Sequence, residues 1–466
     1  MPPIIATAVF LTCILGLFWL DRDPQAKTSK ALWIPVIWLL LAGSRNVSEW
    51  MDLSPLTDSP DRYLEGNPLD RIVQSGLLVL AAIVLARRGR TKSFLLANVP
   101  ILLYFGYCGV SLLWSDYPDL SFKRWVKALG DVIMVLVVLT DTNPFAALRR
   151  LVTRIGFFLI PISILFIRYY PDFGRAYSRW EGTMFYTGVT TNKNTLGMVC
   201  LVVGLGSLWR FTQVLRSPKS NGKKGPLIAH GILLAMVMWL LHMANSATSL
   251  SCFVLAGGLI VATSFRAVRR RPAVVHLLVA SVLLISFSAL FLDIGSGMLA
   301  GIGRNSTLTG RTTLWAEILR HTVSPLFGAG YETFWVGPRM ETIWAITGQH
   351  PNEAHDGYLE VYMNLGWIGV SLLAVLMVTG YRNIMRDFRR HPEEASLRLA
   401  FFVAAAAYNF TEAAFKMMHP LWIFLLLSIV FVPRFGKRGK LAAGGDGHAA
   451  GAGWHSANEP KLVEVG

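Results

Sequence analysis

The sequence is poor in charged residues and in cysteine. Asp, Glu, Lys and Arg make up 15% of the 466 residues, against about 25% in soluble domains, so the chain is not an ordinary soluble enzyme. The four cysteines, Cys13, Cys108, Cys200 and Cys252, lie far apart inside apolar runs. Because they form neither a C-x-x-C pair nor a zinc-ligand spacing, they exclude a disulfide scaffold and a zinc site of this type.

Apolar residues are abundant. They make up 53% of the chain, and the mean hydropathy is +0.47. A membrane helix needs roughly 20 mostly apolar residues, and on this basis we predict an all-α polytopic membrane protein with about 12 or 13 transmembrane helices. The candidate spans are residues 4–20, 29–44, 72–86, 94–113, 126–141, 151–169, 194–211, 227–244, 249–266, 273–292, 361–379, 397–412 and 419–434.

The distribution of Lys and Arg predicts the orientation in the membrane. The chain has 44 Lys and Arg against 28 Asp and Glu, a net charge of +16. Most of these cations fall in alternate loops, at 22–30, 87–92, 149–154, 210–224, 266–271, 382–398 and 434–440. The positive-inside rule places these loops in the cytoplasm and, with thirteen spans, the N-terminus outside. Basic helix ends would meet anionic lipid, so the charge does not indicate nucleic acid.

The apolar spans, the longest loop and the composition of the tail divide the chain into three parts. Residues 1–434 are predicted to form a single polytopic membrane domain, and the small, Gly-rich and Ala-rich tail 435–466 is predicted to be cytoplasmic and disordered. Residues 293–360 form the longest predicted outer loop, and a connection of that length is usually functional. Within it, residues 311–323 have apolar positions at spacings of three and four, which predicts a short helix along the membrane surface.

Five basic residues lie on the outer side, where Lys and Arg are scarce. They are Arg175, Arg179, Lys193, Arg304 and Arg311. Each one alone is either a lipid-headgroup anchor or a ligand contact. As a set in two long loops they predict an anion site, because guanidinium groups bind diphosphate oxygens in bidentate fashion. A cationic pocket on the outer face suggests a lipid diphosphate.

A histidine precedes the eleventh predicted span. His355 could accept a proton near neutral pH, and either Glu353 or Asp356 could hold its tautomer. His350 competes for the same role, and an interfacial histidine is often only a polar surface residue. No H-E-x-x-H, EF-hand or D-x-D pattern occurs in the outer loops, so we expect neither a metal nor a cofactor.

Several motifs resemble those of the O-antigen ligase and polymerase family. The order T-G-R, P-x-x-G-x-G, H-N/D-x-x-L and G-x-x-G, which that family shows in its large periplasmic loop, matches Thr309–Arg311, Pro325–Gly330, His355–Leu359 and Gly366–Gly369. Upstream, residues 179–182, 192–197, 246–249 and 113–115 resemble further elements of the family. The resemblance runs from about residue 45 to residue 430. The segments 44–50 and 66–71 look more like its exopolysaccharide polymerases.

The resemblance implies a GT-C-like membrane glycosyltransferase. Such an enzyme of the bacterial inner membrane takes a glycan from undecaprenyl diphosphate on the periplasmic face. It passes the glycan to a growing chain, as a polymerase in O-antigen or exopolysaccharide synthesis, or to lipid A core, as a lipopolysaccharide ligase. We favour the polymerase. Family members are thought to invert the anomeric centre without metal or cofactor, and other envelope polysaccharide assembly proteins are expected partners.

The resemblance also assigns roles to residues. His355 would be the catalytic base, and Arg311 and Arg179 would hold the diphosphate. Substrate-binding residues are expected in the same loops: Arg304, Arg175, Lys193, Asn194, Glu353 and Asp356. Asp356 is a departure from the pattern, since many relatives have Asn or Ser there.

Two other classes of protein remain as hypotheses. A transporter or flippase for the lipid-linked sugar would carry ionisable or helix-breaking residues at mid-membrane, whereas these spans have almost no charge at their centres. A structural scaffold would have no need of the clustered outer arginines. Both are therefore less favoured than an enzyme that acts at the outer surface.

Overall fold

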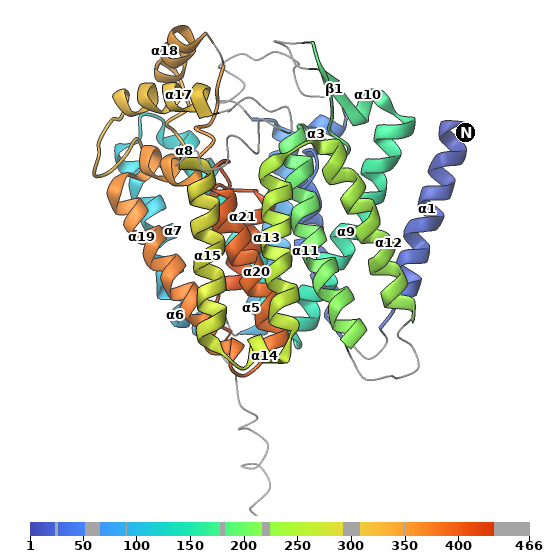
Figure 1. The fold of residues 1–466 in the computed structure, drawn as a ribbon. Coiled ribbons are helices and arrows are strands. Elements are labelled where there is room, and N and C mark those ends of the chain that lie inside the picture. The colour runs from blue at the N-terminus through green and yellow to red at the C-terminus, as the bar shows by residue number, and fades with distance from the viewer. Residues whose placement is uncertain are drawn as a thin grey trace, which may run out of the picture. The chain divides into compact units, whose positions relative to one another are not determined.

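The fold of the described residues is almost entirely helical (Figure 1). The computed structural model describes residues 1–23, 27–51, 66–89, 91–177, 182–216, 224–291, 308–348 and 350–432. Within these ranges the two strands, β1 (Arg175–Tyr177) and β2 (Met184–Tyr186), form an antiparallel pair in which Ala176 faces Phe185. The predicted all-α fold is confirmed.

The helices follow one another through short connections. The first half contains α1 (Pro3–Leu20), η1 (Lys30–Leu32), α2 (Trp33–Ala42), α3 (Val47–Trp50), α5 (Pro68–Arg88), α6 (Thr91–Ala97), α7 (Val99–Val110), η2 (Ser111–Trp114), α8 (Pro118–Leu139), α9 (Pro144–Tyr169) and α10 (Pro171–Gly174). The second half contains α11 (Lys193–Arg216), α12 (Lys224–Ala244), α13 (Ala247–Ser264), α14 (Arg266–Arg269), α15 (Pro272–Phe291), α17 (Leu308–Arg320), α18 (Pro338–Thr347), α19 (Gly357–Phe388), α20 (Pro392–Tyr408) and α21 (Pro420–Ile429).

The described helices confirm a multi-pass membrane protein but give fewer full-length spans than predicted. Seven of them, α1, α5, α9, α11, α12, α13 and α19, are long and apolar enough to cross a membrane, and α6 with α7, bent by 91°, makes an eighth if it counts as one broken span. The other predicted spans are helices too. They are short, as in the ten-residue α2 and α21, or they carry charge, as α8 does at Lys123, Arg124, Lys127 and Asp131. The sequence pattern located the helices but not their lengths.

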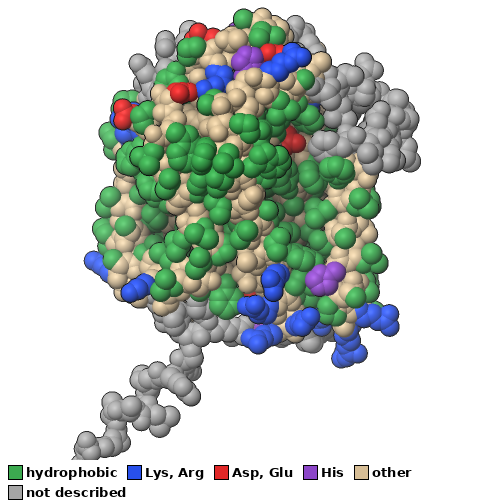
Figure 2. Space-filling model, turned by 90° about the vertical axis from the view of Figure 1, so that its left-hand side faces the viewer, with side chains coloured by type: hydrophobic (Ala, Val, Ile, Leu, Met, Phe, Trp, Pro, Cys, Tyr) green, Lys and Arg blue, Asp and Glu red, His purple; other side chains and the backbone are tan. Residues whose placement is uncertain are grey.

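Burial separates a central group of helices from a lipid-facing ring. Every residue of α21 is buried, although the helix is strongly apolar. By contrast α1 exposes Ile4, Leu15 and Trp19. Figure 2 shows a broad band of apolar side chains on one face, with Lys and Arg gathered along its lower edge. An apolar outer surface of this kind suits contact with lipid chains.

A second stretch of backbone packs against α19 at a break within that helix. At Gly366 the helix breaks, with φ at +62°, and the chain after Pro325 docks into the break. Gly330 N–H donates to Asn364 O at 2.9 Å, and Trp367 N–H donates to Pro325 O at 2.9 Å. A Cβ atom at Gly366 would lie 2.2 Å from the Leu326 carbonyl oxygen. The glycine motifs of this region therefore serve close backbone approach.

This backbone packing predicts a stability effect. Gly366→Ala is expected to lower the free energy of unfolding by about 1–3 kcal/mol or more, because alanine is strained at positive φ and there is no room for its methyl group. Thermal unfolding in detergent measures the change. Gly258→Ala in α13 is the matched control, since nothing lies within 4 Å of its Cβ position. Equal stability of the two variants would contradict the prediction.

Candidate functional site

The candidate site begins in the loop that leads into α19. Asp356 is the N-cap of that helix, and its Oδ1 accepts from the N–H groups of Tyr358 and Leu359, both at 2.9 Å. Gly357 N–H donates to Asn409 O at 2.8 Å, and a Cβ at Gly357 would lie 1.9 Å from Asn409 Oδ1. His355 itself has a positive φ of 52°. Strained backbone of this kind is typical of functional sites, and here the helix cap and the Asn409 contact hold it in place.

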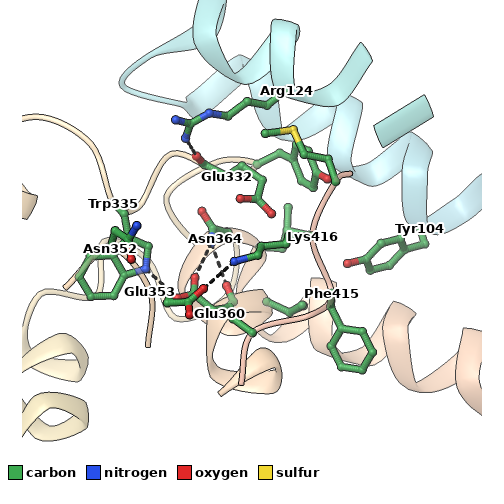
Figure 3. A pocket seen from close by; sticks show the side chains of 15 residues that line it. Tyr104, Arg124, Glu332, Trp335, Asn352, Glu353, Glu360, Asn364, Phe415 and Lys416 are labelled. Atoms are coloured by element: carbon green, nitrogen blue, oxygen red, sulfur yellow. Dashed lines mark hydrogen bonds and ion pairs between the residues drawn. The ribbon is translucent and has the colours of Figure 1, made fainter. Parts of the chain in front are cut away.

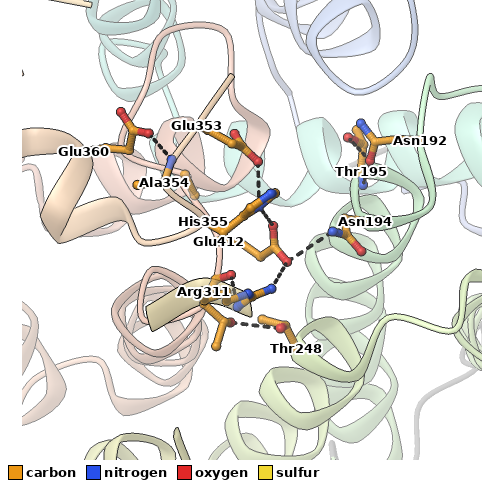
Figure 4. Close-up of polar contacts among 12 residues, drawn as sticks. Asn192, Asn194, Thr195, Thr248, Arg311, Glu353, Ala354, His355, Glu360 and Glu412 are labelled. Carbon is orange, nitrogen blue, oxygen red and sulfur yellow. Dashed lines mark hydrogen bonds and ion pairs between the residues drawn. The ribbon is translucent and has the colours of Figure 1, made fainter. Parts of the chain in front are cut away.

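Two carboxylates face one nitrogen of His355 (Figure 4). Its Nδ1 lies 3.1 Å from Glu353 Oε1 and 3.3 Å from Glu412 Oε2. Burial lowers the pKa of His355, but hydrogen bonds to Glu353 and Glu412 outweigh burial and raise the pKa to about 9. Nε2 has no hydrogen bond among the described residues, and 36% of the side chain is exposed. When His355 is neutral, the two carboxylates therefore keep its proton on Nδ1, and Nε2 is the nitrogen that can accept a proton.

Glu412 joins three separate parts of the chain. Besides His355, its Oε1 accepts from Asn194 Nδ2 of α11 at 3.1 Å and pairs with Arg311 of α17 at 3.6 Å. The Glu412 side chain is only 8% exposed. Arg311 also donates to the Thr411 carbonyl oxygen at 2.9 Å. The structure therefore brings His355, Arg311 and Asn194 together around a carboxylate that the sequence analysis did not single out.

A signal for Glu412 was present in the sequence. The residue ends the apolar segment 397–412, which we interpreted as a span and not as part of the site. An acidic residue at the outer end of an apolar run is unusual, because burial of a carboxylate is costly unless it is paired. The partners of Glu412 are distant in sequence, so its position at the end of an apolar segment does not indicate which residues it contacts.

A polar cavity lies on the far side of Glu353 (Figure 3). Its volume is about 160 Å³. Lys416 Nζ reaches Glu353 Oε2 at 2.5 Å, and the ion pair lowers the pKa of Glu353 and raises that of Lys416 in spite of burial. Glu332 also lines the cavity, with a φ of +57° and a pKa raised mainly by burial. Lys416 therefore holds Glu353 ionised beside His355.

The other basic residues of the predicted anion site do not contact His355 or Glu412 in the described part of the chain. Arg179 and Arg304 are outside the described residues. Arg175 in β1 donates to the Ile167 carbonyl oxygen from Nε at 3.1 Å and from a terminal nitrogen at 2.9 Å, which fixes the hairpin. Lys193 is exposed at the first residue of α11.

The structure distinguishes the residues that were offered as alternatives. Between the two proposed partners of His355, Glu353 contacts the ring, whereas Asp356 caps α19. Burial raises the pKa of Asp356 to about 6. His350 stacks on Trp344, with ring centroids 4.4 Å apart.

The donor set of the site also resembles a metal site. Glu353, His355 and Glu412 each offer a ligand atom, and these atoms lie within 4.8 Å of one another. However, Lys416 already pairs with Glu353, and Arg311 pairs with Glu412. A divalent cation would have to bind beside these two cations. The charges of the two carboxylates are therefore already balanced by side chains of this chain.

Comparisons with known proteins agree with this site. Residues 225–374 match the family model described as O-Antigen ligase. The exopolysaccharide production protein ExoQ of Rhizobium meliloti (strain 1021) is similar, at 26% identity over 310 residues that cover 64% of this chain and 68% of that protein. Both matches support the O-antigen ligase and polymerase family. The resemblance seen in the sequence motifs is thus confirmed.

The family match covers only part of the site. It runs from α12 into α19 and includes Arg311, Glu353 and His355, whereas Asn194 and Glu412 lie outside it. In the structure, α11 supplies Asn194 and the segment after α20 supplies Glu412. An imidazole with a free nitrogen beside a guanidinium can assist proton removal and neutralise an anionic leaving group.

Proposed function

We propose that this protein is a membrane glycosyltransferase that polymerises lipid-linked glycan repeats in surface polysaccharide synthesis. The family supports an enzyme of the O-antigen ligase and polymerase type, with lipid-linked glycans as substrates and polysaccharide acceptors. The observation that carries the proposal is the cluster in which Glu412 contacts both His355 and Arg311. The name of the Rhizobium relative refers to exopolysaccharide production and the description of the family model to an O-antigen ligase, so the choice of a polymerase rests on the resemblance of segments 44–50 and 66–71.

In the proposed reaction His355 Nε2 takes the proton of an acceptor hydroxyl. The acceptor oxygen then attacks the anomeric carbon from the face opposite the diphosphate, so the configuration inverts. The bond between that carbon and the diphosphate oxygen breaks, and undecaprenyl diphosphate leaves with the electron pair. Arg311 has five N–H donors, so it can keep its contacts with Glu412 and Thr411 and still meet the leaving oxygens. Arg179, outside the described residues, is proposed as the second cation, and no step requires a metal.

The proposed location is the bacterial inner membrane, with this cluster on the periplasmic side. The N-terminus, α17 and α18 lie at the same end of the bundle as the start of α19 (Figure 1). The polyprenyl tail of the donor would lie against the apolar helices. Arg304, Arg175 and Lys193 remain proposed contacts for the substrate, together with Asn194, Glu353 and Asp356.

The proposal predicts how activity depends on pH. With a pKa of about 9, His355 is protonated at pH 7 and cannot act as a base. The value of kcat/KM is therefore expected to rise with pH up to about 9. The Glu412→Gln variant removes one of the charges that raise this pKa, so its curve should level off at lower pH. Transfer assays with purified protein and a lipid-linked donor between pH 6 and pH 10 measure this. A flat profile would exclude His355 as the base.

Complementation distinguishes the proposed acceptors. Cells that lack this chain are given the wild-type gene, and their surface glycan is separated by gel. New long chains support the polymerase, whereas attachment of preformed chains to lipid A core supports the ligase. Donor flipping by purified protein in liposomes, without sugar transfer, would contradict both and favour a transporter.

A further inference from the structure

A second cationic cavity lies between α1 and α9, at the end of the bundle opposite the start of α19. Its volume is about 420 Å³, and ten residues line it: Phe18, Asp21, Arg22, Asp23, Lys27, Thr28, Arg150, Thr153, Arg154 and Phe157. Four of these are basic and two are acidic. Nothing in the glycan transfer proposed above uses this cavity.

Both acidic residues are paired with cations from outside the cavity lining. Asp23 accepts from Arg149 at 2.6 Å. Asp21 lies 3.9 Å from Arg210 and 3.5 Å from His230. Asp23 is thus directly bonded to Arg149, whereas Asp21 Oδ1 has these longer contacts and no hydrogen bond in the described part of the chain.

Two basic residues of the lining, Arg150 and Arg154, contact neutral groups among the residues that the structure describes. Arg150 donates to the Thr28 hydroxyl at 2.6 Å and to the Asp23 carbonyl oxygen at 3.0 Å, both of which are neutral acceptors. Arg154 stacks over the Trp33 ring at 4.3 Å, and one of its terminal nitrogens is buried without a hydrogen-bond partner in the described part of the chain. A buried guanidinium N–H without an acceptor is costly, so its presence points to an anionic ligand.

The surroundings of the cavity indicate what kind of anion would fit. Phe18 and Phe157 stack edge to face, with ring centroids 5.3 Å apart, and form an apolar part of the lining. Trp19 is 73% exposed and Trp33 is 41% exposed, and exposed tryptophans of this kind are typical of the membrane interface. Since α1 is a peripheral, lipid-facing helix, the cavity combines a cationic headgroup region with an apolar wall. A small soluble anion would make no favourable contact with the apolar part of the lining.

We propose that this cavity binds the phosphate headgroup of an anionic membrane lipid, with Arg150 and Arg154 as the main contacts. Basic pockets between membrane helices bind such headgroups elsewhere. The bound lipid would fasten the peripheral helix α1 to α9. This proposal does not depend on the glycosyltransferase assignment, because it concerns the other end of the bundle.

Lipid retention tests the proposal. The purified full chain is mixed with vesicles of phosphatidylcholine with or without phosphatidylglycerol, re-purified, and analysed for co-purified lipid by mass spectrometry. Wild type is expected to retain phosphatidylglycerol in preference to phosphatidylcholine. Each charge removed is expected to weaken binding about fivefold. The Arg150→Gln/Arg154→Gln variant should therefore bind phosphatidylglycerol roughly 20- to 30-fold more weakly than wild type.

Two control variants separate a site from general surface charge. Arg266→Gln/Arg269→Gln removes two charges from α14 and should retain the lipid as wild type does. Arg150→Lys/Arg154→Lys keeps the charge and should retain most of the binding. Equal loss in the α14 variant, or unchanged retention in Arg150→Gln/Arg154→Gln, would overturn the proposal.

Competition with inorganic phosphate identifies the source of the anion. Millimolar phosphate is expected to leave the bound lipid in place, because the apolar wall adds to lipid binding alone. Binding of phosphate without retention of phosphatidylglycerol would overturn the assignment to a lipid. Equal retention of phosphatidylcholine and phosphatidylglycerol by wild type would also overturn it, and this comparison needs no variant.

Discussion

The His355→Ala variant is expected to lose glycan transfer by about 10²–10⁴-fold, the usual contribution of a general base. The ring has two carboxylates on Nδ1 and a free Nε2, so no other described side chain in this cluster has the same arrangement. The measurement is the rate of chain formation by purified protein, with surface glycan in complemented cells as a second readout. The variant should insert and fold, because 36% of the His355 side chain is exposed.

His350→Ala is the matched control for this prediction. It removes the neighbouring histidine, which stacks on Trp344, and it should keep activity close to wild type. Full activity of the His355 variant together with a large loss in the His350 variant would reverse the assignment of the base. Full activity in both would leave the mechanism without a histidine base.

The second large effect is expected at Arg311. Arg311→Ala should lower kcat by about 10²–10³-fold, since a positioned donor to a developing negative charge typically contributes this much. Arg311→Lys should recover only part of the rate, because an ammonium group cannot form the two parallel hydrogen bonds of a guanidinium. Single-turnover rates with a lipid-linked donor measure both variants.

Arg320→Ala on the same helix is the control for charge and for helix stability. Arg320 is 76% exposed and pairs only with Glu317 among the described residues, at 3.1 Å. An exposed ion pair contributes little, so activity should stay near wild type. If Arg311→Ala raised KM and left kcat unchanged, Arg311 would bind the ground state of the donor and would not stabilise the leaving group.

Lys416 keeps the Glu353 carboxylate ionised although that carboxylate is buried. Glu353 is held ionised by this lysine, and the ionised carboxylate in turn raises the pKa of His355. A raised pKa means that protonated His355 stabilises the folded state below its ordinary pKa, and this contribution is lost as the pH rises toward 9. The same network therefore links the protonation of the base to the local stability of the loop before α19.

The sequence was informative about elements and local motifs. Each of the thirteen apolar segments overlaps a helix in the described part of the chain, because a long apolar run in a membrane satisfies its backbone hydrogen bonds within a helix. The helix predicted within 311–323 exists as part of α17, ending at Arg320. The motif glycines were also visible, and Gly366 proved to be a break in α19 and not a position within a regular helix.

The sequence by itself indicated a helical membrane protein with motifs similar to those of the O-antigen ligase and polymerase family, and it showed which charged residues stand between the apolar segments. Only the tertiary structure decided which of those residues meet. Glu353 and not Asp356 contacts His355. Glu412 contacts Asn194, which lies 218 positions earlier in the sequence. Local patterns report periodicity and capping, whereas contacts between distant helices depend on how whole faces pack, and this packing is not encoded within any one segment.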